Sequence, residues 1–234
     1  MSAALCHVRR YELQPNGICD GQSRPVHPPL QFQILIPMNS TTDPKTLDTL
    51  LTVIHSRQQT SPKRLGEPGP SHEQVDQILS AAGAAPDHGL LHPWRLIVIP
   101  PERRHLLAET FAAALVVRDG EATEEQRQDA RAKAFRGPFL VMVIARLDPE
   151  LGPIHPHERI ISAGCAIQNM LLTAQAMGFG AGLSTGRAMH SQAMKDLFGL
   201  SAHEQPLCFM TLGTVLVSKS PRPSPDMTHY TTTL

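Results

Sequence analysis

The sequence has few features that would indicate a membrane protein or a nucleic-acid-binding protein. Its 21 Lys and Arg residues equal its 21 Asp and Glu residues, so no net positive field favours nucleic acid or an anionic membrane. The longest apolar stretches, such as residues 139–145, fall far short of the roughly 20 residues that span a bilayer. The N-terminal segment lacks the apolar region and cleavage site of a secretory signal. We therefore expect a soluble, cytoplasmic protein.

Cysteine and aromatic residues are also scarce. Only 4% of the residues are aromatic, and the four cysteines (Cys6, Cys19, Cys165 and Cys208) have no paired spacing that would indicate a metal site. Because thiols stay reduced in the cytoplasm, we expect Cys165 and Cys208 to pack as small buried hydrophobic side chains. The chain of 234 residues, 41% of them hydrophobic, is long enough to bury a core in one large domain or two small ones.

The motifs of several common enzyme classes are missing. The sequence contains no G-x-S-x-G, H-E-x-x-H or G-x-x-x-x-G-K-[ST] motif, and no G-x-G-x-x-G follows a predicted strand. His155, His157 and Glu158 in the segment HPHE have side chains that can bind a metal. Pro156 separates the two histidines and no third ligand is evident, which favours a solvated loop.

Proline, at 21 residues, concentrates towards the two ends of the chain. Residues 1–40 mix proline with polar residues and show no helical or strand period, which predicts a disordered leader. A regular pattern begins directly after Met38, and we interpret Met38 as the true start of the protein; a genuine N-terminal arm is the alternative. Residues 41–234 form the predicted domain, which ends in a proline-rich tail with the sequence SKSPRPSPD.

Capping residues and apolar periods predict the helices. Asp43 with Pro44 begins the first, and a Ser71–Gln74 pair in capping-box register begins the second. Apolar residues at helical spacing then indicate buried stripes on both helices and on the long helix that follows later. These stripes are Leu47, Leu50, Leu51 and Ile54 in the first helix, Val75, Ile78, Leu79 and Ala82 in the second, and Ile160, Gly164, Ile167, Leu171 and Ala174 in the long one.

The remaining elements complete an α+β pattern. We predict further helices over residues 101–117, 123–135, 158–177 and 191–198, and strands over 95–99, 139–145 and 207–217. Helices separate these strands without a strict repeat of strand and helix. A mixed sheet with helices around it is therefore favoured over a doubly wound fold.

Two segments together resemble the FMN-dependent nitroreductases, in particular their small YdjA-like branch. Residues 56–100 contain an arginine-led segment after the first helix, an RL-x-EP-x-P linker, and APDH followed by PWR before a strand. Residues 162–186, SAGCAIQNMLLTAQAMGFGAGLSTG, are similar to the central helix and flavin loop of that family. The resemblance implies a nitroreductase-like α+β fold with a mixed or antiparallel sheet flanked by helices, in an obligate homodimer with FMN at the interface.

The same resemblance implies a reaction. An enzyme of this family transfers hydride from NADH or NADPH to FMN and passes electrons to a nitroaromatic, quinone or similar acceptor in a ping-pong exchange. Because the cofactor carries the chemistry, no catalytic side chain is expected. Residues 173–178, where the family's nicotinamide contacts fall, are explained equally well as helix packing. The proline-rich tail is expected to clasp the other subunit.

Arg57, Gln58 and Gln59 stand where the family has Arg-Arg-Ser or a similar sequence. Arg57 can make a forked, charge-assisted contact with the phosphate of FMN, whereas the two glutamines offer only neutral donors. Arg57 can instead compensate the helix dipole. One cation of the family pattern is missing, and it can come from Lys63, Arg64 or Arg222, each of which can equally be a surface cation.

The resemblance assigns two further groups to the flavin. His88 in the PDH segment is expected to contact the FMN of the other subunit, with a hydrogen bond inside its own turn as the alternative. Leu183, Ser184 and Thr185 match the family's W-x-[ST]-G loop, with Leu183 replacing the aromatic residue. The hydroxyl and N–H groups of Ser184 and Thr185 can bond to the polar edge of the ring. Trp94 is expected to pack in the core rather than stack on the flavin.

Two rival functions remain at this point. One is a flavin-fragmenting enzyme that shares the fold. The other is a flavin-binding or redox-sensing protein without turnover, since the missing second arginine and the missing loop aromatic should both weaken the binding of FMN.

Overall fold

The computed structural model describes residues 43–220, 223 and 225–234. The predictions of a leader over residues 1–40, of a start at Met38 and of a phosphate contact from Arg222 lie outside these residues.

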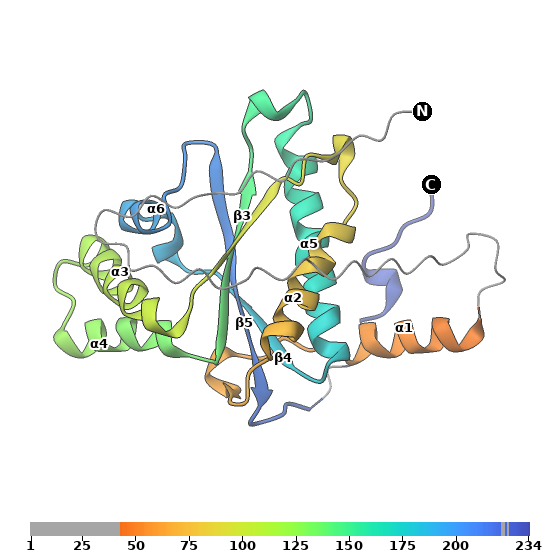
Figure 1. Cartoon of the computed structure of the whole chain (residues 1–234), viewed down its shortest axis with the longest axis horizontal. Helices are drawn as coiled ribbons and strands as arrows, with labels where there is room; N and C mark the ends of the chain where they lie inside the picture. The colour runs from red at the N-terminus through yellow and green to blue at the C-terminus, as the bar shows by residue number, and fades with distance from the viewer. Residues whose placement is uncertain (1–42, 221–222, 224) are drawn as a thin grey trace, which may run out of the picture. The chain divides into compact units, whose positions relative to one another are not determined.

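An antiparallel sheet of five strands forms the centre of the described domain (Figure 1). Strand β5 (Glu204–Val215) pairs with β3 (Phe139–Arg146) on one edge, and β3 pairs in turn with β2 (Trp94–Val98). Strand β5 also pairs with β4 (Gly180–Ser184) and, at its C-terminal end, with the two-residue β1 (Leu65–Gly66). An isolated parallel bridge joins Gln59 to Ala181. The α+β prediction with a mixed or antiparallel sheet is confirmed.

Local capping sets the ends of several helices, and the caps predicted at Asp43 and Ser71 are confirmed. Asp43 caps α1, and reciprocal capping boxes begin α2 at Ser71 with Gln74 and α4 at Thr123 with Gln126. Gly199 ends α6 in the left-handed conformation, with φ of 56°. The helices are α1 (Pro44–Ser56), α2 (His72–Ser80), α3 (Arg104–Arg118), α4 (Glu124–Ala132), α5 (Pro156–Ala176) and α6 (Gln192–Phe198), and the single turns used below are η2 (Ala81–Ala84), η3 (His88–Leu90), η5 (Lys133–Phe135) and η7 (Arg187–His190).

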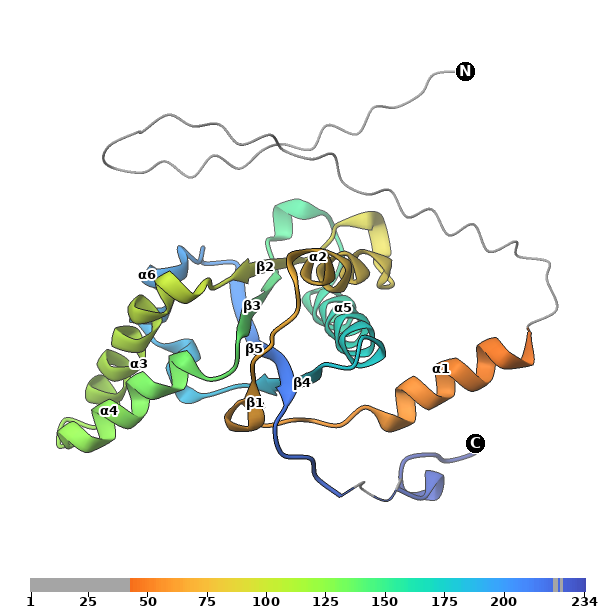
Figure 2. The same ribbon diagram turned by 60° about the horizontal axis from the view of Figure 1, so that its bottom comes forward.

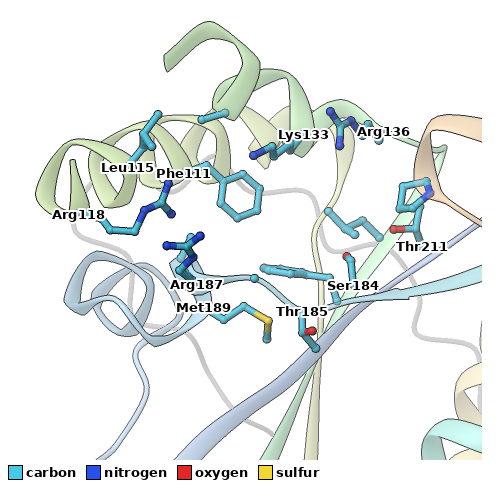
Figure 3. A pocket seen from close by; sticks show the side chains of 16 residues that line it. Phe111, Leu115, Arg118, Lys133, Arg136, Ser184, Thr185, Arg187, Met189 and Thr211 are labelled. Atoms are coloured by element: carbon cyan, nitrogen blue, oxygen red, sulfur yellow. The ribbon is translucent and has the colours of Figure 1, made fainter. Parts of the chain in front are cut away.

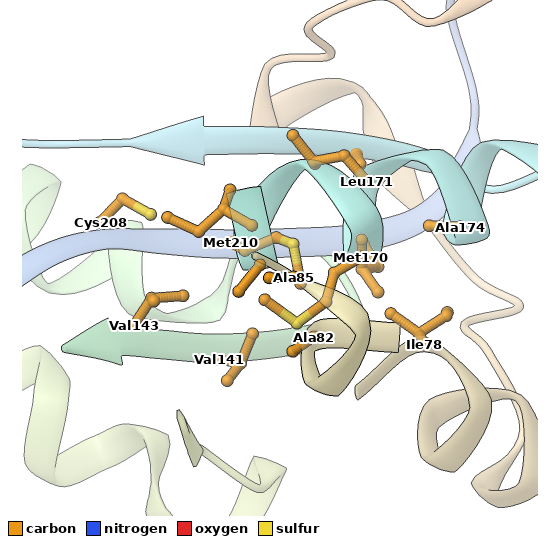
Figure 4. Packing of buried hydrophobic residues seen from close by; sticks show 14 residues of the cluster. Ile78, Ala82, Ala85, Val141, Val143, Met170, Leu171, Ala174, Cys208 and Met210 are labelled. Atoms are coloured by element: carbon orange, nitrogen blue, oxygen red, sulfur yellow. The ribbon is translucent and has the colours of Figure 1, made fainter. Parts of the chain in front are cut away.

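Both faces of the sheet are covered. Helices α2 and α5 lie on one face and α3, α4 and α6 on the other (Figure 2). Because successive strand residues point to opposite faces, Val141 and Val143 of β3 join the α2–α5 core, shown in Figure 4, while Met142 and Ile144 join the α3–α6 core. A continuous apolar run in β3 is what a strand buried on both faces requires.

The predicted stripe on the long helix is only partly correct. Ile167, Leu171 and Ala174 are buried, but Gly164 faces solvent with nothing near its missing side chain. The buried face of the helix also includes Arg159, Ser162, Ala163, Ala166 and Met170. It is therefore rotated about the helix axis relative to the predicted stripe. This helix packs on α2 and η2 as well as on the sheet, and periodicity alone does not reveal that second neighbour.

Helix α1 exposes the apolar stripe that the sequence predicts to be buried. Leu47 and Leu50 are 48% and 51% exposed, and none of the 13 residues of α1 is buried. The helix extends away from the sheet beside the end of α5 (Figure 2). The prediction that this stripe is buried is therefore wrong for the part of the chain that the structure describes.

Cys208 is buried in the core between the sheet and α5, as predicted, and burial raises the pKa of its thiol to about 12. Cys165 is half-buried against the same core. Among the helices that the structure describes, none combines the length and the apolar character needed to cross a bilayer.

Candidate functional site

The segment after α1 is fastened to β4 through Gln59. The side-chain amide of Gln59 donates from Nε2 to the carbonyl of Leu183 at 2.5 Å, and the N–H of Leu183 donates to Oε1 at 3.1 Å. The N–H of Thr60 donates to the carbonyl of Ala181 at 2.8 Å. Gln59 and Leu183, both predicted from the sequence, are thus brought together, and the amide of Gln59 holds the end of β4.

Strand β4 is the longer of the two strands that sequence reasoning missed, the other being the two-residue β1. Its residues, GAGLS, have little strand propensity, and the family resemblance led us to expect a loop at Leu183 and Ser184. The glycines are needed because the segment around Thr60 lies directly against the strand: a Cβ at Gly182 would come within 2.0 Å of the carbonyl oxygen of Thr60. Pairing with β5 and this close approach together make the segment a strand.

A cavity of about 330 Å³ opens where β4 ends (Figure 3). Ser184, Thr185 and the backbone of Gly186 line one side of it, and Thr211 of β5 adds a third hydroxyl. The apolar part of the wall comes from α3, β3, β5 and η7, through Phe111, Leu115, Leu140, Met189 and Phe209. The predicted residues Ser184 and Thr185 therefore lie at an aromatic-lined cavity on the α3–α6 side of the sheet.

Four cations line this cavity: Arg118, Lys133, Arg136 and Arg187. No Asp or Glu among the described residues lines it. The nearby acids are used elsewhere, since Glu109 and Glu124 hold Arg131 at 2.9 and 2.8 Å. The cavity is therefore suited to an anionic or electron-rich ligand. Sequence reasoning missed these cations because they come from three separate segments and show no common motif.

A smaller cavity of about 170 Å³ lies beside Gln59. Gln58, Gln59 and Thr60 line it together with Lys219, which follows β5. Arg57 is half-buried at the C-terminal end of α1, where its N–H bonds to Val53, and its side chain does not line this cavity. Lys63 and Arg64 line neither cavity. Among the described residues, Lys219, which the sequence analysis did not single out, is the cation that lines the smaller cavity.

His88 lies apart from both cavities. Its Nδ1 is 2.9 Å from a carboxylate oxygen of Glu158 at the start of α5, and this hydrogen bond holds the pKa of Glu158 below its usual value. Both side chains are at least half exposed. The loop that carries His88 is unusual: Leu90 and His92 have positive φ angles of 54° and 45°, which cost energy for residues other than glycine. Such strain is typical of functional loops.

The His88–Glu158 pair predicts a measurable pH dependence. Because the pKa of Glu158 is lowered, the stabilising contact is present above the ordinary carboxyl pKa of 4.5 and is lost as the pH falls through the lowered value. We expect His88→Gln to raise the pKa of Glu158 towards 4.5, measured by ¹³C NMR of the carboxyl group. His157→Gln is the matched control; an equal shift in that variant would contradict the assignment.

Three lesser candidates have structural roles. Trp94 is half-buried and packs against the α2–α5 core, as predicted. The hydroxyl of Thr173 bonds to the carbonyl of Asn169 within α5, and Ala174 is fully buried, so packing accounts for both residues. His155 caps α5 and stacks on His157, and no group of metal-binding side chains large enough to hold an ion occurs in the described part of the chain.

Comparison with known proteins relates this chain to the nitroreductases. The profile of the nitroreductase family matches residues 57–214. The protein named "Putative NAD(P)H nitroreductase" in Haemophilus influenzae is 35% identical over 164 residues, covering 70% of this chain and 87% of the relative. The protein named "Putative NAD(P)H nitroreductase YdjA" in Escherichia coli is 33% identical over 191 residues, covering 79% of this chain and 100% of the relative.

Solved structures agree on the fold. A nitroreductase-like protein from Bacillus cereus matches with a TM-score of 0.67 at 18% identity, over 84% of this chain and 98% of the other. Nitroreductase CinD from Lactococcus lactis, in complex with 4-nitrophenol, matches with a TM-score of 0.61 at 13% identity, over 79% and 98% of the two chains. The recognised motifs, the antiparallel sheet and these matches lead to one conclusion: the chain belongs to the nitroreductase family of oxidoreductases.

Proposed function

We propose that this protein is a homodimeric FMN-dependent enzyme that oxidises NADH or NADPH and reduces a nitroaromatic, quinone or similar acceptor by ping-pong exchange. The observation that carries the proposal is the cavity at the end of β4, which combines hydroxyl donors, four cations and aromatic walls. With a quinone as acceptor, NAD(P)H and one proton supply two electrons and two protons, giving NAD(P)⁺ and the quinol.

The residues present fit a flavin. Its ring needs an apolar slot with donors at the polar edge, and Leu140, Phe209, Ser184 and Thr185 provide both. When bound, FMN supplies the hydride chemistry. The protein's own groups orient the ring and, through Lys133 and Arg136, offer positive charge where negative charge develops on reduction. Among the residues that the structure describes, no acidic side chain lines the cavity to oppose this charge.

The phosphate end is assigned to the smaller cavity. Gln59 links the two cavities, since it lines the smaller one and bonds to Leu183, next to Ser184 in the larger one. Gln58 and Lys219 would then face the phosphate, whereas Arg57, expected from the sequence to contact it, does not line this cavity. A single cation and two neutral amides bind a phosphate less tightly than two cations do.

This assignment predicts opposite effects of two substitutions on the dissociation constant of FMN. Lys219→Gln should weaken binding about tenfold, because a charge-assisted hydrogen bond is lost, and Gln58→Arg should tighten it about tenfold, because one is gained. Fluorescence titration of the flavin measures both. Lys195→Gln on α6 changes the net charge equally away from the cavities and should leave the constant unchanged. If neither Gln58 nor Lys219 has an effect, the phosphate lies elsewhere.

A second copy of the chain is the partner that the exposed apolar surface fits. A helix of 13 residues with no buried side chain is marginal in water by itself, and its leucine stripe needs a covering surface. Leu90, 78% exposed beside His88, and Ile161, 66% exposed on α5, extend the apolar surface. Because α1 leads directly into Arg57 and Gln59, a dimer through α1 would bring the partner's surface to the site.

The test of the proposed function is a spectrum followed by an assay. Protein mixed with FMN and passed through gel filtration should keep its visible flavin bands at dimer size, and it should oxidise NADH or NADPH faster when menadione is added. Flavin retention without oxidation of NADH or NADPH would favour a flavin-binding protein without turnover, and loss of all flavin would overturn the proposal.

His88→Ala should weaken the binding of FMN if this residue reaches the partner's site. An unchanged affinity for FMN would remove His88 from the site.

A further inference from the structure

The larger cavity has a second cationic end that the flavin assignment does not use. Arg118, from the last turn of α3, and Arg187, from η7, point towards one end of the cavity, whereas Arg136 and Thr211 lie at the other (Figure 3). Phe111 lies between the two ends, and Leu115 and Met189 line the apolar wall near Arg118 and Arg187. The chain therefore places two guanidinium groups beyond an apolar, aromatic surface.

Neither guanidinium has a carboxylate to neutralise it. Within residues 43–220, 223 and 225–234, no Asp or Glu oxygen lies within 4.0 Å of Arg118 or Arg187, and neither side chain donates a hydrogen bond to the described residues. Both arginines are exposed to water, which screens their mutual repulsion, and an anion bound between them would remove the rest of it. The dipole of α3 favours a cation at its C-terminal end and accounts for Arg118. It does not account for Arg187, which begins a short turn.

We propose that Arg118 and Arg187 form an anion subsite that selects aromatic acceptors carrying a carboxylate. The aromatic ring would lie against Phe111 and Met189, and the two planar guanidinium groups would bind the carboxylate by forked hydrogen bonds. This inference rests on the proposed function, because it places the acceptor in the cavity that holds the flavin ring. What it adds to the proposed function is the negative charge of the acceptor.

A matched pair of acceptors tests the subsite. 4-Nitrobenzoate and 4-nitrobenzamide have nearly the same shape and differ by one negative charge. The FMN-loaded protein should have a KM for the benzoate about tenfold lower than for the benzamide, since a charge-assisted pair of hydrogen bonds is worth about that factor at a partly exposed site. The preference should shrink as salt is raised from about 0.02 to about 0.3 M, because exposed charges are screened.

Substitutions assign the effect to the two arginines. Arg118→Gln or Arg187→Gln should raise the KM for 4-nitrobenzoate about tenfold and leave that for 4-nitrobenzamide within about twofold. Arg127→Gln is the matched control: it removes one positive charge from α4, where Arg127 pairs with Glu124 outside the cavity. A similar loss in that variant would attribute the preference to overall charge and overturn the subsite.

A binding measurement separates this inference from the proposed function. 4-Aminobenzoate, which cannot be reduced, should bind the protein in equilibrium dialysis about tenfold more tightly than 4-aminobenzamide, and Arg187→Gln should abolish the difference. Reduction of menadione without any preference for the anionic ligand would overturn the subsite and keep the proposed function. Preference for 4-aminobenzoate in a protein that reduces nothing would keep the subsite and overturn the reductase.

Two further outcomes would assign the arginines to another anion. If Arg118→Gln and Arg187→Gln lower the affinity for FMN, the groups bind the cofactor's phosphate and the subsite is wrong. If they raise the KM for NADPH and not that for 4-nitrobenzoate, the anion belongs to the nucleotide, and the proposal is overturned in the same way.

Discussion

Gly182→Ala should lower the free energy of unfolding by about 3 kcal/mol and release the segment around Gln59 from β4. The added Cβ would lie 2.0 Å from the carbonyl oxygen of Thr60, and the contact is with backbone, which no side-chain rotation can relieve. Moving Thr60 away breaks its hydrogen bond to Ala181 and both bonds between Gln59 and Leu183. Urea denaturation measures the loss of stability.

Gly120→Ala is the control for this substitution. Gly120 lies in the turn between α3 and α4, and a Cβ there meets nothing within 4 Å. The free energy of unfolding of the Gly120→Ala variant should stay within about 0.5 kcal/mol of the wild-type value. If Gly182→Ala were equally harmless, the close approach of the segment around Thr60 to β4 would be wrong, and with it the connection between the two cavities.

Arg159→Met should lower the free energy of unfolding by about 3 kcal/mol as well. Arg159 is only 1% exposed, and its guanidinium donates to the carbonyl oxygens of Ile154 at 3.0 Å, Asp148 at 2.5 Å and Gly152 at 2.7 Å. Methionine fills much of the same volume but satisfies none of these acceptors. The loop from β3 to α5 loses its anchor, and Glu158, which holds His88, lies directly beside it.

Two companion variants sharpen the second prediction. Arg159→Lys keeps the charge without the planar fork and should fall between Arg159→Met and the wild type. Arg103→Met removes an exposed arginine at the start of α3 and should change stability by no more than about 0.5 kcal/mol. Thermal unfolding followed by circular dichroism ranks all three. Equal effects at positions 103 and 159 would mean that the loop carbonyls need no donor from Arg159.

Most of the fold could be predicted because its signals are local. The capping pairs of Ser71 with Gln74 and of Thr123 with Gln126 join residues three apart, so the chain itself brings them together. The apolar run of β3 needs two covering layers, and both are present. The family resemblance likewise depends on short segments in a fixed order.

The apolar stripe on α1 and the strand β4 are features that local sequence patterns do not predict correctly. The period of Leu47, Leu50 and Leu51 predicts the helix correctly but not what covers it, because burial depends on a neighbour elsewhere. Strand β4 has the composition of a turn and becomes a strand only because β5 and the segment around Thr60 lie on its two sides.

The sequence by itself determined the helices, the main strands and the family, and it singled out Ser184 and Thr185, which line the larger cavity. Only the tertiary structure decided that Gln59 fastens β4, that Lys219 lines the smaller cavity, and that four cations from α3, from η5 and the residue after it, and from η7 line the larger one. The reason is physical: caps and apolar periods act over a few residues along the chain, whereas a cavity is formed by side chains that only folding brings together.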